Sequence, residues 1–109
     1  MKDSSINMAV IGLGGRGFGM MCNLLEMKDV NIIGVCDLLE ERKQRAFDKV
    51  KEERGIGPAA ETDYRKILEL KELDAVLITT SWQTHLRIAI DAMNAGKYVA
   101  SEVGGACSV

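Results

Sequence analysis

The sequence predicts an α/β fold built on a doubly wound parallel sheet with strand order 3-2-1-4-5. Three observations support this prediction. First, apolar β-branched runs alternate strictly with stretches of helical spacing along the 109 residues. Second, the strand runs are almost continuously apolar, which is typical of parallel strands covered on both faces by crossover helices. Third, a glycine-rich turn follows the first strand, and right-handed crossovers then favour this strand order.

The first half of the chain predicts two strands and two helices. "INMAVIG" (6–12) is a β-branched strand, and "GFGMMCNLLEMK" (17–28) has the apolar spacing of a helix. "VNIIGVCD" (30–37) is a second strand that ends in an acid, which completes a βαβ unit. "LLEERKQRAFDKVKEERG" (38–55) is a charged helix that ends at Gly55 and places on one side Leu39, Ala46 and Val50.

The second half continues the alternation. "PAAET" (58–62) is a short extended piece, after which either Thr62 or Asp63 can cap a helix carrying Tyr64, Ile67 and Leu68. "DAVLITT" (74–80) is a clear apolar strand. The next helix has its apolar residues at i, i+3, i+4 and i+7, namely Leu86, Ala89, Ile90 and Met93. "YVASEV" (98–103) is the last strand.

Composition excludes several classes of function. Hydrophobic residues make up 47% of the chain and charged residues 28%, and the net charge is −2. This globular profile lacks the basic excess of a nucleic-acid binder or a protein of anionic membranes, so neither partner is expected. Cys22, Cys36 and Cys107 lack CxxC spacing, which favours free thiols over a disulfide framework or a zinc site. No window of 18 residues is uninterruptedly apolar, so we expect a soluble, cytoplasmic protein. We also expect no bound metal.

The glycine-rich turn predicts a dinucleotide site. Gly12, Gly14 and Gly17 form G-x-G-x-x-G between a strand and a helix. The first glycine permits the tight turn, the second lets a diphosphate approach the backbone, and the third allows close helix packing. Asp37 follows Gly17 by twenty residues (37 − 17), where a carboxylate accepts hydrogen bonds from the adenosine ribose and repels a 2′-phosphate. The fold is therefore expected to be of the Rossmann type, with NAD favoured over NADP. The alternative interpretation is that the glycines form a structural turn and that Asp37 is an ordinary surface residue.

Three motifs resemble one family across nearly the whole chain. They are "VIGLGGRG" (10–17), "ITTSWQTHLRIAIDAMNAGKYV" (78–99) and "SEVGG" (101–105). The sequence is similar to the N-terminal domain of the glucose-fructose oxidoreductase and inositol dehydrogenase family, Gfo/Idh/MocA. Members pair a Rossmann domain with a C-terminal α/β domain that carries most of the substrate site, and many act on sugars or polyols. Thr80 and His85 match the family's TP-x-x-x-H loop, with Ser81 replacing its proline.

The third motif departs from the family. Val103 stands where most members have a lysine implicated in nicotinamide contact and proton handling, and Gly104 replaces a proline. The NAD-dependent α-N-acetylgalactosaminidases, a branch of the same superfamily, are similar here, and Trp82, His85 and Glu102 also match them. The resemblance implies that NAD is contacted by Gly15, Arg16, Asp37, Thr80, Ser81, Trp82, Gln83, Thr84, His85, Glu102 and Val103.

Structural alternatives stand beside three of these residues. Arg16 can be a solvated side chain at a helix start, because backbone amides usually hold the phosphates. Trp82 can cap the apolar end of the sheet. His85 can be satisfied by a helix cap or a backbone carbonyl. Cys36 is read as a packing residue. The residues alone assign no catalytic group.

Three functions remain open from the sequence. The leading one is an NAD-dependent oxidoreductase domain that acts on a sugar or polyol. The second is an NAD-dependent glycoside hydrolase, in which transient oxidation of the sugar permits elimination of the aglycone. The third is a non-catalytic nucleotide-binding domain. The chain stops at "GGACSV", directly after the fifth predicted strand, so residues 1–109 are expected to be the NAD-binding domain of a longer protein. An uncovered last strand leaves a homo-oligomer open.

Overall fold

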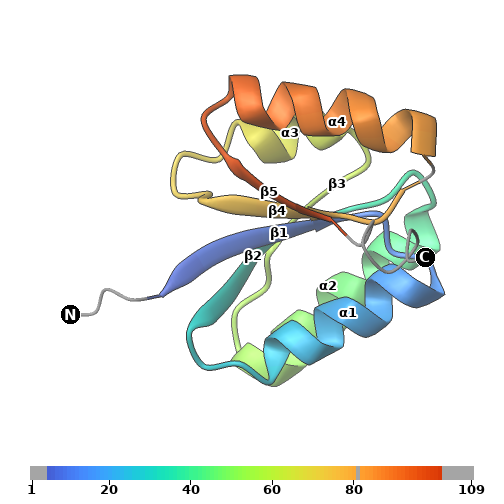
Figure 1. Ribbon diagram of the computed structural model, residues 1–109. Helices are drawn as coiled ribbons and strands as arrows, with labels where there is room; N and C mark the ends of the chain where they lie inside the picture. Colours follow the sequence, from blue (N-terminus) through green and yellow to red (C-terminus); the bar gives the residue numbers. More distant parts are fainter. Residues whose placement is uncertain (1–4, 81, 102–109) are drawn as a thin grey trace.

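One parallel sheet organises the molecule (Figure 1). The computed structural model describes residues 5–80 and 82–101, and of residues 82, 83 and 101 it describes the backbone alone. Within these residues the sheet has the order β3-β2-β1-β4-β5, and every neighbouring pair is parallel. The fold class and strand order are therefore confirmed. The strands are β1 (Ile6–Ile11), β2 (Val30–Cys36), β3 (Ala59–Glu61), β4 (Ala75–Ile78) and β5 (Tyr98–Ser101).

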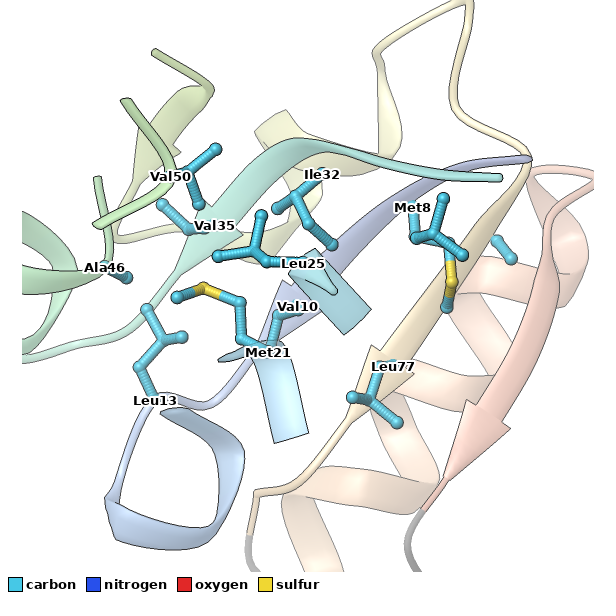
Figure 2. Packing of buried hydrophobic residues seen from close by; sticks show 12 residues of the cluster. Met8, Val10, Leu13, Met21, Leu25, Ile32, Val35, Ala46, Val50 and Leu77 are labelled. Atoms are coloured by element: carbon cyan, nitrogen blue, oxygen red, sulfur yellow. The ribbon is translucent and has the colours of Figure 1, made fainter. Parts of the chain in front are cut away.

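Helices cover both faces of the sheet, as the continuous apolar strands predict. In Figure 1, α1 (Gly15–Leu25) and α2 (Glu40–Arg54) lie on one face, and α3 (Tyr64–Leu68) and α4 (Trp82–Asn94) lie on the other. Each face has its own buried cluster. Figure 2 shows the first cluster, in which two α1 residues pack against two strand residues: Met21, Leu25, Val10 and Val35.

The helix ends follow from local chemistry. The carboxylate of Asp63 accepts a hydrogen bond from the Arg65 amide at 3.0 Å, so Asp63 rather than Thr62 caps α3. Gly55 has a φ of 81° and ends α2 in the left-handed conformation that favours glycine. Helix α1 begins at Gly15, two residues before the predicted start, directly after the second glycine of the turn.

In two helices the apolar spacing of the sequence does not coincide with the buried face. Leu39 is 50% exposed because it is the N-cap of α2 and precedes the helix. In α4, the large side chains Leu86, Ile90 and Met93 are 62%, 47% and 60% exposed. The buried α4 residues are Ile88, Ala89 and Ala92. Small side chains let the helix approach the sheet closely, so the two alanines together with Ile88 define its packed face.

The described part of the chain has free cysteines at Cys22, which is half-buried, and at Cys36, which is buried. Cys107 lies outside the described residues. None of the described helices has the length and apolarity needed to cross a membrane.

Candidate functional site

The glycine turn between β1 and α1 packs against the end of β4. Gly12 has a φ of +98°, and a Cβ placed there would lie 2.8 Å from Thr79 Oγ1. The same hydroxyl donates a hydrogen bond to the Gly12 carbonyl oxygen at 2.7 Å. A Cβ at Gly17 would collide with that carbonyl oxygen. These two glycines therefore allow the turn, the first helical residues and β4 to meet without side chains between them.

Gly14 differs from these two glycines because no backbone atom lies close to the position of its missing Cβ. It is the N-cap residue of α1 and carries no side chain, so no capping side chain covers the start of this helix. A Cβ at Gly14 would meet only the Arg42 guanidinium, with Nη1 at 3.4 Å. An anion can approach the backbone here, close to the positive end of α1 and to one arginine.

Asp37 joins the two loops that follow β1 and β2. Its Oδ2 accepts a hydrogen bond from the Leu13 amide at 2.7 Å, and its Oδ1 accepts one from the Leu39 amide at 2.8 Å. The residue is 9% exposed, so these bonds hold its carboxylate in one position. Each carboxylate oxygen has two lone pairs, which leaves capacity to accept a bond from a ribose hydroxyl.

A cavity of about 580 Å³ lies at the carboxyl ends of the strands and joins these features. Its lining includes five of the residues proposed from sequence: Gly12, Gly14, Asp37, Thr80 and Thr84. In the part of the chain that the structure describes, four proposed residues do not line it: Gly15, Arg16, Gly17 and His85. Trp82 and Gln83 are known by their backbone, which starts α4, whereas Ser81, Glu102 and Val103 lie outside the described residues.

The lining also contains charged and aromatic residues that the sequence did not single out. Arg42 lines the cavity, as do Arg65, Arg87 and Tyr64. They come from α2, α3 and α4, so only the folded chain brings them together. The described lining residues include three arginines and a single carboxylate, that of Asp37. The cavity is thus suited to an anionic ligand such as a diphosphate.

Cys36 also lines the cavity, at the end of β2. Burial, followed by the nearby Asp37 carboxylate, raises the pKa of its thiol to about 12. The group is therefore a neutral thiol at physiological pH, which agrees with a packing role and excludes a thiolate nucleophile. The described residues contain no cluster of His, Cys, Asp and Glu side chains that could hold a metal ion.

The comparison that decides the family covers residues 6–103. This range matches the sequence model of the Gfo/Idh/MocA oxidoreductase family, described as its NAD-binding Rossmann fold. The chain belongs to this family. Its cofactor is accordingly NAD, and the cavity agrees with that assignment. Its lining includes Gly14, which has no side chain, arginines that suit a diphosphate, and a fixed carboxylate at the end of β2.

The names of similar proteins point to two different reactions. The chain is 42% identical over 108 residues to glycosyl hydrolase family 109 protein 2 of Akkermansia muciniphila, covering 95% of the chain and 23% of that protein. The structure of myo-inositol 2-dehydrogenase from Lactobacillus plantarum is 28% identical, with a TM-score of 0.76, over 89% of the chain and 27% of that protein. The chain thus spans about a quarter of the length of each.

The chain is also similar to a solved structure that contains a bound cofactor. Scyllo-inositol dehydrogenase from Lactobacillus casei, solved with bound NAD(H) and scyllo-inositol, shares 24% identity and a TM-score of 0.74. The match covers 89% of the chain and 27% of that protein. At this identity the likeness shows a common fold.

Proposed function

We propose that this domain holds NAD across the carboxyl ends of β1, β2 and β4. The diphosphate lies over Gly14 beside Arg42, the adenosine ribose meets Asp37, and the nicotinamide half extends toward Thr80 and the start of α4. The observation that best supports this placement is the single cavity that Gly14, Asp37 and Thr80 share. In doubly wound sheets, dinucleotides bind at this edge, where the strand order reverses.

In this proposal, two domains have different roles in the reaction. Bound NAD supplies hydride transfer, while residues 1–109 bind and orient it and a second domain supplies the substrate site. The substrate is a sugar or polyol. The proposal also places the protein in the cytoplasm, which agrees with the free thiols of Cys22 and Cys36. We also propose that the domain can self-associate through β5, the last strand of the described sheet.

Two reactions compete for the complete enzyme. The 42% identity to a protein named as a glycosyl hydrolase favours NAD-dependent glycoside hydrolysis, which reverses the order in which the sequence alone places the two. The second candidate is a polyol dehydrogenase, favoured by the 28% identical myo-inositol 2-dehydrogenase. In both reactions this domain binds and orients NAD.

We expect the complete enzyme, which contains both this domain and a substrate domain, to release nitrophenolate from a p-nitrophenyl N-acetylhexosaminide without accumulating NADH. The physical reason is that a hydrolase returns the hydride within each turnover, whereas a dehydrogenase keeps it on the cofactor. Absorbance is followed for nitrophenolate and NADH in parallel, with free polyols as the second substrate set. NADH formation from polyols with no release of nitrophenolate would establish the dehydrogenase instead.

The domain should bind NAD more tightly than NADP, and Asp37→Ala should narrow this preference. A charged hydrogen bond to the ribose contributes about 1.5–3 kcal/mol, and the same carboxylate repels a 2′-phosphate. Because Asp37 also holds the Leu13 and Leu39 amides, the substitution will weaken both cofactors through the loops. The measured quantity is therefore the ratio of the two dissociation constants. An unchanged ratio in the variant would argue against the ribose role.

A further inference from the structure

A hydrogen bond joins the helices that follow β3 and β4. The Tyr64 hydroxyl, at the start of α3, donates to Asp91 Oδ2 of α4 at 2.5 Å. The two helices lie side by side on one face of the sheet (Figure 1). Burial and this hydrogen bond raise the pKa of Tyr64, so the phenol stays protonated and keeps its donor at neutral pH.

Tyr64 lines two cavities. One is the NAD cavity, and the other is a surface groove of about 550 Å³ between α3 and α4. Tyr64, Arg65 and Arg87 line both of them, whereas Asp91 lines only the groove. Asp91 therefore reaches the NAD cavity through the side chain of Tyr64.

The position of Tyr64 in the fold assigns it to one half of the dinucleotide. In the proposed placement Asp37, at the end of β2, meets the adenosine ribose. Strand β3 is the neighbour of β2 on the side away from β1, and Tyr64 begins the helix after β3. The ring thus lies on the adenosine side of the site, where an aromatic face can pack against adenine.

The ring needs a constraint to form such a wall. Tyr64 is partly buried against the cluster between the sheet, α3 and α4. The charge-assisted bond from its hydroxyl to Asp91 fixes the end of the ring that the cluster does not enclose. Without this bond, only the cluster and the Arg65 guanidinium, 5.7 Å from the ring centroid, would constrain the ring, and part of its ordering on cofactor binding would come at the expense of affinity.

We propose that Asp91 is a positioning residue of the NAD site, which holds Tyr64 as the wall against which the adenosine half of the cofactor packs. This inference rests on the proposed placement of NAD in the cavity. Asp91 itself does not contact the cofactor, and its effect on binding is confined to ligands that contain adenosine.

The test is a double-mutant cycle on the 109-residue chain, with Tyr64→Phe, Asp91→Ala and their combination. Each dissociation constant is measured for ADP-ribose and for nicotinamide mononucleotide by NMR titration. We expect ADP-ribose to bind about threefold more weakly in both single variants, with no further loss in the double variant. Nicotinamide mononucleotide should bind equally in all of them. Tyr64→Ala, which removes the ring, should cost about tenfold in ADP-ribose affinity.

Two controls accompany the cycle. Asp91→Asn keeps an acceptor oxygen and should restore binding, and Tyr98→Phe removes the hydroxyl of a tyrosine that is 80% exposed on β5. Additive losses, equal weakening of nicotinamide mononucleotide, or unchanged ADP-ribose affinity in the single variants would each overturn the inference while leaving NAD binding intact. Failure of the unmutated chain to bind NAD and ADP-ribose would remove the proposed function, and this inference with it.

Discussion

Gly17→Ala is expected to destabilise the domain by about 3 kcal/mol or more, at the upper end of the cost of overpacking a core. The added Cβ would collide with the backbone carbonyl of Gly12 and with Thr79 Oγ1, which donates a hydrogen bond to that carbonyl oxygen. None of these atoms is the free end of a flexible side chain, so α1 itself must move. A domain of this size has a total stability of about 5–15 kcal/mol, of which this is a large share.

Urea unfolding followed by circular dichroism measures this effect. Gly19→Ala is the matched control, because Gly19 is an exposed residue of the same helix and a Cβ there would meet no atom within 4 Å. Alanine should stabilise that position by about 0.5–1 kcal/mol. Equal unfolding midpoints for the two variants would show that α1 does not pack on the turn as described.

Gly14→Val should lower NAD affinity by about a hundredfold or more while leaving a folded α/β protein. Gly14 has φ and ψ of −65° and −174°, which valine adopts readily, and its Cβ would meet only the flexible end of Arg42. The fold therefore tolerates the change. The branched side chain would, however, occupy the space through which the diphosphate approaches the helix.

The measurement is an NAD titration beside a far-UV spectrum, with Gly19→Val as the control for a branched residue in α1. Retained affinity in Gly14→Val with an unaltered spectrum would place the diphosphate elsewhere. The comparison with Gly17→Ala is informative because the two glycines lie three residues apart, yet one should affect stability and the other binding.

Local patterns were sufficient for much of this architecture. The strand order follows from alternating elements and right-handed crossovers, and the place of the cavity follows from the glycine turn and Asp37. These features depend on short stretches of sequence whose geometry is nearly obligatory, such as the positive φ at Gly12. They could therefore be predicted before any tertiary contact was known.

Features set by packing were not predictable in the same way. The buried face of α4 depends on how closely Ala89 and Ala92 approach the sheet, and an apolar spacing rule gives more weight to large side chains. Tyr64 and Arg87 lie 23 residues apart (87 − 64) and line the same cavity only because α3 and α4 pack together. Arg42 alone carried a signal, since it lies in the first turn of a helix that starts at the ligand edge of the sheet.

An NMR titration of the isotopically labelled chain with NAD shows whether the cofactor binds at the carboxyl ends of the strands. We expect saturable shifts for the amides of Gly12, Gly14, Asp37 and Thr80, which line the cavity. We expect no shifts for Asn31, Ile56 and Gly57, which line a separate hollow. Shifts confined to that hollow, or the absence of saturable binding, would contradict NAD binding at this edge of the sheet.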